Sequence, residues 1–298
     1  MNFIKLDIEH KNIFDEYFKI FQPEIADLTF TNLYMWKDYY NLYWTEHKNY
    51  LLIMAKPENT HPFLHGPVGL EINSFEEVIY DTKKFFEENG LEFIIKRASE
   101  KTVELLNTSS IKFLHTAERD LSDYVYIVED LIQLKGKKYH AKKNHINKFL
   151  KTYEGRYQIR EIDHTLIDKC YEFECEWYKN RNGEKDIGLT YEKKAIENAL
   201  KHYEILGYKG ISVFIDNQVK AFTFGEPLNS DTVVIHIEKA DPEIEGLYTF
   251  INQAFLKYYW SDYKYVNREE DLGKEGIRKA KLSYHPYKFA YKYTISFK

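Results

Sequence analysis

A chain of 298 residues, 44% of them apolar, can fill one large core or two of ordinary size. Its net charge of −5 argues against a general affinity for nucleic acid, so a polyanion would need a local basic patch. No window holds the roughly 18 apolar residues of a membrane helix, and the opening MNFIKLDIEHKNIF is neither a secretory signal nor a lipidation motif. We therefore expect a cytoplasmic protein without a membrane span.

The first half of the chain predicts a mixture of strands and helices. Helices are expected where apolar residues recur every three to four positions, and strands where short apolar runs lie between turns. The helix at 74–90 also starts on a serine cap and ends on a glycine. The expected order is strand 2–8, helices 12–21 and 30–40, strands 42–47, 50–55 and 62–67, helix 74–90, strand 92–97, helix 100–107, and strands 111–117 and 123–129.

The second half predicts nearly the same order. It runs as strand 157–162, helices 167–180 and 191–206, strands 208–216, 220–227 and 232–240, helix 247–260, a strand around Tyr265, a helix around Ile277, and strand-like 287–297. Shared order at an offset of roughly 155–170 residues indicates two domains of one fold. We assign 1–130 to the first domain and 131–298 to the second, both in the α/β class with a mixed sheet flanked by helices.

A basic helix over 137–151 is expected to open the second domain. Residues 135–151 hold seven lysines, two histidines and no acid. Such a face could contact phosphate groups, although most charge runs only keep a helix solvated. The candidate phosphate-binding residues are Lys138, Lys142, Lys143 and His145.

Three segments carry a resemblance to a known family: GKKYHAKKNHINKF, EKADPEIEGLYTFIN and NREEDLGKEGIRKAKLSYHP. The element order is similar to that of a GNAT acyltransferase domain, and two in tandem resemble the Fem aminoacyltransferases. With these segments, the chain resembles the C-terminal domain family of phosphatidylglycerol lysyltransferases, in its stand-alone soluble branch. The resemblance implies two tandem GNAT-like domains that transfer an aminoacyl group from aminoacyl-tRNA to a lipid headgroup or a cell-wall amine.

The chain departs from the lipid-modifying members of that family at two points. It lacks their membrane helices, and Ser283 stands where their second lysine precedes an aromatic-x-Pro step. The acceptor therefore stays open among a lipid headgroup, a cell-wall group and an anionic small molecule.

The loop before the helix at 247–260 bears on an alternative, an acetyl-CoA-dependent N-acetyltransferase. GNAT enzymes that bind CoA hold its pyrophosphate at this helix start through a glycine-rich loop. Here the loop carries Asp241, Glu243 and Glu245 around the single glycine Gly246. These acids could simply complement the helix dipole, but each would also repel a close phosphate by roughly 1–4 kcal/mol. CoA binding is disfavoured on either interpretation.

The strand at 232–240 carries polar residues on one face. Alternation places His236, Glu238 and Ala240 together, and Asp241 follows. Aminoacyl transfer from an ester needs a base near the acceptor, and Glu238 or His236 could serve. A carboxylate could instead hold the α-ammonium of the aminoacyl group. The alternative interpretation is a strand edge that faces solvent.

The segment NREEDLGKEGIRKAKLSYHP follows the neighbouring strand. We expect Asn267, Arg268, Glu269 and Asp271 to line a cleft there, and Arg278, Lys279 and Lys281 to face it from the next helix. A salt bridge between Glu269 and a lysine is the structural alternative. The family resemblance implies that Lys281 lies where charge develops on the transferring carbonyl. Four apolar side chains should anchor the segment: Leu272, Ile277, Leu282 and Tyr284.

The sequence contains no P-loop, GxGxxG, HExxH, GxSxG or Cys/His cluster, so we expect no metal and no cofactor. The two cysteines, Cys170 and Cys175, have the wrong spacing for a metal pair and are expected to be free thiols. The leading hypothesis is an aminoacyltransferase with catalytic residues His236, Glu238, Glu269 and Lys281 that uses aminoacyl-tRNA. A catalytically silent tandem GNAT protein that binds such a ligand is the alternative from a different class.

Overall fold

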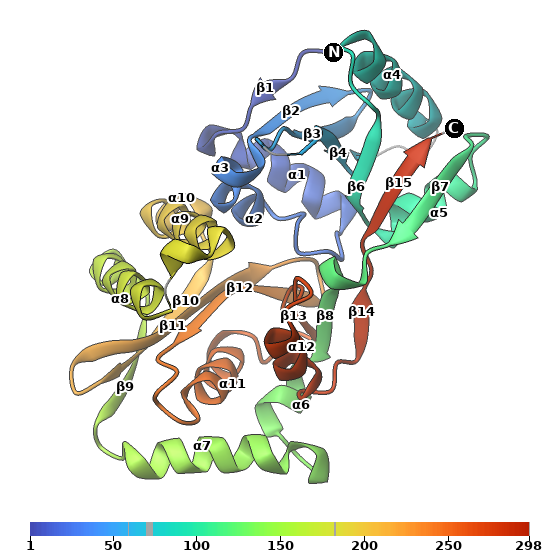
Figure 1. The fold of residues 1–298 in the computed structure, drawn as a ribbon. Helices are drawn as coiled ribbons and strands as arrows, with labels where there is room; N and C mark the ends of the chain where they lie inside the picture. Colours follow the sequence, from blue (N-terminus) through green and yellow to red (C-terminus); the bar gives the residue numbers. More distant parts are fainter. Residues whose placement is uncertain (59, 70–73, 182, 298) are drawn as a thin grey trace. The chain divides into compact units, whose positions relative to one another are not determined.

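The computed structural model describes residues 1–58, 60–69, 74–181 and 183–297 (Figure 1). The chain forms two compact units. Unit 1 comprises Met1–Asp123, Glu270–Glu275 and Phe289–Lys298, and unit 2 comprises Tyr124–Glu269 and Gly276–Lys288. No helix within these described ranges is both long and apolar enough to cross a bilayer.

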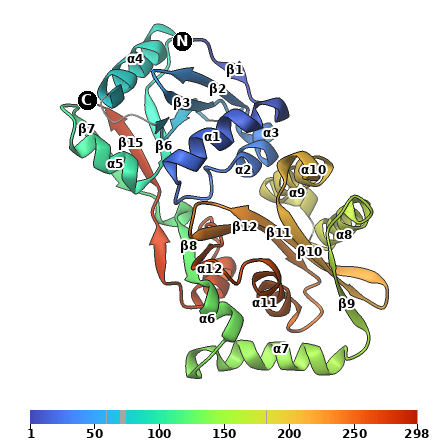
Figure 2. The ribbon, with the colours of Figure 1, turned by 180° about the vertical axis from the view of Figure 1, so that it is seen from behind.

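Unit 1 is built on a mixed sheet in the order β1-β2-β3-β4-β6-β15-β7, with β5 paired to β3 (Figure 2). The helix α4 packs on this sheet because Phe75, Val78 and Phe86 share a core with Leu52 and Ile95. The elements of this sheet and its helices are β1 (Ile4–Lys5), α1 (Lys11–Phe21), α2 (Phe30–Met35), α3 (Lys37–Tyr40), β2 (Leu42–His47), β3 (Tyr50–Ala55), β4 (Phe63–His65), β5 (Val68–Gly69), α4 (Phe75–Glu88), β6 (Ile94–Ala98), α5 (Glu100–Asn107), β7 (Phe113–Ala117) and β15 (Tyr293–Phe297).

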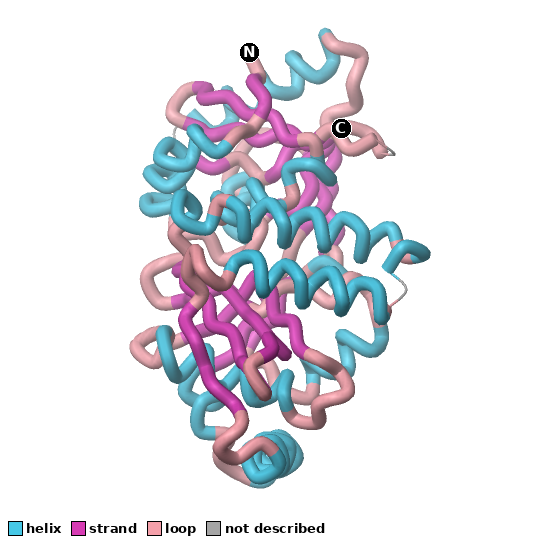
Figure 3. The backbone as a smooth tube through the Cα atoms, turned by 90° about the vertical axis from the view of Figure 1, so that its left-hand side faces the viewer, coloured by secondary structure: helices cyan, strands magenta, loops and turns pink. Residues whose placement is uncertain are grey.

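Unit 2 is built on a second mixed sheet in the order β14-β8-β13-β12-β11-β10-β9. Helices α8 and α9 lie side by side on one side of it, as Figure 3 shows, and α11 packs between its strands and α7. The elements are β8 (Asp123–Ile127), α6 (Val128–Gln133), α7 (His140–Thr152), β9 (Tyr157–Glu161), α8 (Ile167–Asn180), α9 (Ile187–Lys201), α10 (Tyr203–Leu206), β10 (Lys209–Ile215), β11 (Gln218–Pro227), β12 (Thr232–Ala240), α11 (Leu247–Tyr259), β13 (Tyr265–Asn267), α12 (Glu275–Leu282) and β14 (Lys288–Ala290).

The predicted elements agree closely with this structure, although two predicted helices are interrupted. The expected helix 30–40 divides at Trp36, and the expected helix 191–206 divides at His202. Both sulfhydryl groups are free, with Cys170 buried and Cys175 half-buried. The prediction of an α/β fold with mixed sheets and flanking helices is confirmed.

The division of the chain differs from the predicted one at 130/131. Unit 2 already begins at Tyr124, because β8 pairs with β13. The end of the chain returns to unit 1, because β15 pairs with β6 on one side and β7 on the other. The basic helix α7 therefore lies inside unit 2 after β8 and α6, and does not open it.

A cluster of buried charges lies in unit 1. The ammonium of Lys292, fully shielded from solvent, lies 2.5 Å from Asp27, 2.7 Å from Asp123 and 3.1 Å from Glu270. Arg97 adds a second cation, 2.5 Å from Asp27. Burial raises the pKa of Asp123 to about 7, against the pull of Lys292. Three carboxylates and two cations from five separate segments thus depend on one another.

Candidate functional site

The candidate site lies in unit 2, where the parallel strands β12 and β13 diverge. They pair only from Thr232 to Val234, opposite Tyr265 to Asn267. β12 continues for six residues beyond this pairing, to Ala240. The side chains of His236 and Glu238 on this extension meet residues that follow β13. The divergence therefore opens a place where polar groups from two strands converge.

Glu238 is held by partners on both oxygens. Its Oε1 accepts a hydrogen bond from Arg268 at 2.9 Å, and its Oε2 accepts one from Asn252 of α11 at 2.8 Å. The Glu238 side chain is 13% exposed and the Arg268 side chain 11%. Glu238 is thus a fixed, partly accessible carboxylate on the side of the sheet that α11 covers.

His236 lies fully buried between two carboxylates. Its Nδ1 is 3.0 Å from Glu269 and its Nε2 is 3.0 Å from Glu226. Burial disfavours the charged ring, but the hydrogen bonds with Glu226 and Glu269 outweigh it and raise the pKa of His236 to about 9. His236 is therefore protonated at neutral pH, and cannot act there as the general base.

Lys281 of α12 supports the turn that carries Arg268 and Glu269. Its ammonium donates to the main-chain carbonyls of these two residues, at 2.5 Å and 3.0 Å. Glu269 adopts a left-handed backbone (φ 57°), and its N–H donates to the side chain of Asn267. The sequence did not predict these bonds from Lys281 to main-chain oxygens. Lys281 thereby fixes the direction of two site residues.

Two further predicted residues join this group. Asn267 is fully buried, and Lys142 of α7 is half-buried with its ammonium 3.9 Å from the ring centre of Tyr284. Burial, aided by nearby Arg268, lowers the pKa of Lys142 to about 8. One lysine of the basic helix therefore reaches the site, while its neighbours do not.

Asp271 was also predicted to line the cleft. It belongs to unit 1, where it is fully buried and lies 3.5 Å from Arg119. The chain leaves unit 2 after Glu269, which has a left-handed backbone. Only Tyr284 of the four predicted anchors is buried, whereas Leu272, Ile277 and Leu282 are exposed.

The remaining predicted residues lie elsewhere in unit 2. Asp241 is 3.7 Å from Lys220, and exposed Lys138 is 3.3 Å from Asp130. The other four lie on α7 or α12: exposed Lys143, His145 and Lys279, and half-buried Arg278.

Sequence reasoning missed Glu226 and Asn252. A bulge between Phe224 and Gly225 shifts the register of β11 against β12, so simple alternation does not reveal which residue faces His236. Asn252 had a visible signal, because it is a buried amide among Phe250, Ile251 and Phe255 on α11.

The start of α11 is covered by α7. A side-chain carbon added at Gly246 would lie 2.2 Å from the carbonyl oxygen of His145. Glu245 pairs with Lys148 of α7, and Phe149 packs on Phe250 with ring centres 4.5 Å apart. The position at which GNAT enzymes hold a pyrophosphate is thus occupied by protein.

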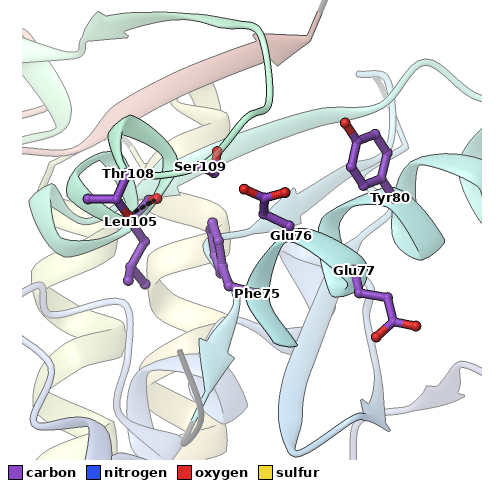
Figure 4. Close-up of a pocket in the computed structure, with 7 residues that line it drawn as sticks. All are labelled: Phe75, Glu76, Glu77, Tyr80, Leu105, Thr108 and Ser109. Carbon is purple, nitrogen blue, oxygen red and sulfur yellow. Dashed lines mark hydrogen bonds between the residues drawn. The ribbon is translucent and has the colours of Figure 1, made fainter. Parts of the chain in front are cut away.

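A separate hollow of about 450 Å³ lies in unit 1. Figure 4 shows its lining from α4, α5 and the turn after α5, including Phe75, Tyr80 and Leu105. None of the predicted site residues lines it. Across the described parts of the chain, no group of three or more His, Cys, Asp or Glu side chains is placed to hold a metal ion.

Several solved structures are similar to this chain. A conserved protein of unknown function from Bacteroides thetaiotaomicron is 32% identical with a TM-score of 0.91, over the whole of both chains. L-PGS from Bacillus licheniformis is 13% identical with a TM-score of 0.67, over 99% of this chain and 93% of that one.

Two more distant structures share the fold. FemX has a TM-score of 0.61 at 9% identity, over 100% of this chain and 98% of that one. A tandem GNAT protein from the clavulanic acid biosynthesis pathway has a TM-score of 0.51 at 8% identity, over 99% and 98%. The predicted fold, two tandem GNAT-like domains, is confirmed.

A curated relative and a family match complete the comparison. The protein MYCGA3080 of Mycoplasmoides gallisepticum is 28% identical over 192 residues, which cover 63% of this chain and only 56% of that relative. Residues 18–296 match the family described as "Phosphatidylglycerol lysyltransferase, C-terminal". The chain therefore belongs to the family of phosphatidylglycerol lysyltransferase C-terminal domains.

Proposed function

We propose that unit 2 transfers an aminoacyl group from aminoacyl-tRNA to an amine or hydroxyl of a small, cell-wall or lipid-headgroup acceptor. The observation that carries this proposal is the carboxylate of Glu238, fixed by Arg268 and Asn252 where β12 and β13 diverge. The family supplies the reaction class, since its description names a lysyltransferase.

In this proposal Glu238 moves the proton. The acceptor nitrogen or oxygen forms a bond to the acyl carbon as its proton passes to Glu238, and the bond from that carbon to the ribose oxygen breaks. The protonated carboxyl then returns the proton to the leaving ribose oxygen. His236 cannot share this role at neutral pH, since its pKa is raised to about 9, mainly by hydrogen bonds that outweigh burial. His236 instead holds Glu269 and Glu226 in position.

Lys281 is a positioning residue in this scheme. Its ammonium holds the carbonyls of Arg268 and Glu269, so it acts on the acyl group through the turn that it supports. A direct oxyanion contact would need the ammonium to exchange these bonds for the substrate.

The covered start of α11 argues against the acetyl-CoA alternative. The carbonyl of His145 lies against Gly246, and carboxylates precede the helix. A pyrophosphate would have to displace α7 and approach Asp241 and Glu243, at a cost of roughly 1–4 kcal/mol for each close like-charge pair.

A thermal-shift comparison of two ligands tests the proposal. We expect a 3′-aminoacylamino-adenosine, which mimics the tRNA end without a cleavable ester, to stabilise the chain. At a hundred times its Kd it should add about 2.7 kcal/mol, whereas acetyl-CoA should add nothing. Stabilisation by acetyl-CoA alone would favour the N-acetyltransferase. Binding of the analogue without turnover of aminoacyl-tRNA would favour a catalytically silent protein.

A further inference from the structure

Two cations meet at the Tyr284 ring in unit 2. The guanidinium carbon of Arg268 lies 4.7 Å from the ring centre, and the ammonium of Lys142 lies 3.9 Å from it. Arg268 follows β13 and Lys142 belongs to α7, so two distant segments bring them together. Their mutual repulsion contributes to the low pKa of Lys142, after the effect of burial.

Arg268 has donor capacity that the protein does not use. Its Nη2 donates to Glu238 at 2.9 Å, whereas its Nη1 is buried and has no hydrogen-bond acceptor among the residues described. The guanidinium also faces the Tyr126 ring at 5.7 Å. A buried N–H group without an acceptor costs free energy, so this group indicates a missing partner.

Lys142 also lacks a counter-ion. Within the described ranges, no carboxylate lies at ion-pair distance from its ammonium, whereas Lys148 of the same helix pairs with Glu245 and Lys138 with Asp130. Glu238 is the carboxylate that bonds Arg268 and attracts Lys142. An anionic group between the two cations could accept from Nη1.

We propose that Arg268 and Lys142 form a subsite for one phosphate group of a substrate. This inference rests on the proposed function, because an aminoacyl ester has no free carboxylate, whereas the nucleotide donor and a headgroup acceptor both carry phosphate. A planar guanidinium fork and a point ammonium that contact one ring suit phosphate oxygens. The Tyr284 hydroxyl interacts with the same guanidinium.

The test compares two lysines of one helix. Inorganic phosphate is titrated by calorimetry at fixed ionic strength into the wild type, Lys142→Gln and Lys143→Gln. Each variant loses one positive charge, but Lys143 is exposed, whereas Lys142 is half-buried against the Tyr284 ring. We expect one phosphate per chain, with affinity about tenfold weaker in Lys142→Gln and unchanged in Lys143→Gln. No binding to the wild type, or equal losses in both variants, would overturn the subsite.

The source of the phosphate is distinguished with two larger probes. Adenosine 5′-monophosphate represents the nucleotide, and glycerol 3-phosphate represents a headgroup. The probe whose affinity falls in both Lys142→Gln and Arg268→Lys identifies the source, and insensitivity of both probes contradicts the proposal. If the wild type transfers aminoacyl groups but Lys142→Gln binds phosphate as tightly as the wild type, only the subsite proposal is wrong. If the protein binds phosphate at this subsite but binds no aminoacyl analogue, only the proposed function is wrong.

Discussion

At the scale of single residues, the buried ring of His236 controls how the site responds to pH. The ring bridges Glu226 and Glu269 at 3.0 Å on each side and is fully shielded from solvent. Its two carboxylates would repel each other if the ring lost its proton. The site is therefore organised around a permanent imidazolium at neutral pH, with Glu238 left as the carboxylate next to Arg268.

We predict that the stabilising effect of His236 is present below pH 6.5 and is lost as pH rises towards 9. The sign follows from the pKa, which hydrogen bonds raise in the folded state to about 9 in spite of burial. The loss should reach about 3 kcal/mol in the free energy of unfolding. Denaturant titrations of the wild type and His236→Gln between pH 6 and 10 would measure it. A difference between the two proteins that does not change with pH would contradict the raised pKa.

Much of the site was predictable residue by residue. Alternation along β12 predicted His236 and Glu238 on one face, but the register shift leaves His236 between the pairs Ile235–Gly225 and Ile237–Phe224 and interrupts that alternation. The position after a neighbouring strand placed Arg268 and Glu269 near them. The assignment of Asp271 to unit 1 was not predictable from the sequence. On either side of it, Glu269 and Leu272 adopt left-handed backbones (φ 57° and 53°), which these residue types rarely do.

At the scale of elements, the packing of α7 on α11 is the feature that separates this chain from a CoA-binding arrangement. The basic helix was predictable from its composition, and Ile146 and Phe149 on it are buried. The packing of α7 on the start of α11 was not predictable, because it depends on the close approach of the His145 carbonyl to Gly246. Only a residue without a side chain permits that approach.

We predict that Gly246→Ala destabilises unit 2 more than Gly155→Ala does. Both glycines have left-handed backbones, at φ 86° and 72°, so both substitutions carry strain of about 1–2 kcal/mol. Only Gly246→Ala adds a clash, with the His145 carbonyl, worth about 1–3 kcal/mol more. Urea unfolding of both variants would show the difference. Equal losses would mean that α7 moves away without cost.

At the scale of the whole molecule, the chain passes between its two units four times. It crosses after Asp123, Glu269, Glu275 and Lys288. The repeated order of elements predicted two similar halves, but it could not reveal that the last strand belongs to the first sheet. That pairing brings together residues far apart in sequence, and local patterns carry no information about it.

We predict that Lys292→Met destabilises unit 1 by about 3–5 kcal/mol, because it removes the ammonium that contacts Asp27, Asp123 and Glu270 together. Adding Asp123→Asn removes one of the stranded charges, so the double variant should be more stable than Lys292→Met alone. Calorimetric unfolding of the wild type, both single variants and the double variant gives the coupling energy. Strictly additive effects would show that the charges do not depend on one another.

The measurement that tests the central claim most directly is aminoacyl transfer by Glu238→Gln beside Glu243→Gln. Both variants lose one carboxylate, but Glu243 is exposed in the loop before α11, whereas Glu238 lies between Arg268 and Asn252. Bulk tRNA charged with labelled amino acids is incubated with phosphatidylglycerol vesicles, cell-wall peptides and small amines, and the label on each acceptor is counted. We expect transfer by the wild type and Glu243→Gln, and a rate lower by about 10²–10⁴ in Glu238→Gln. Equal rates in all three proteins would contradict the assignment of Glu238, and an inactive wild type that acetylates amines from acetyl-CoA would contradict the reaction class.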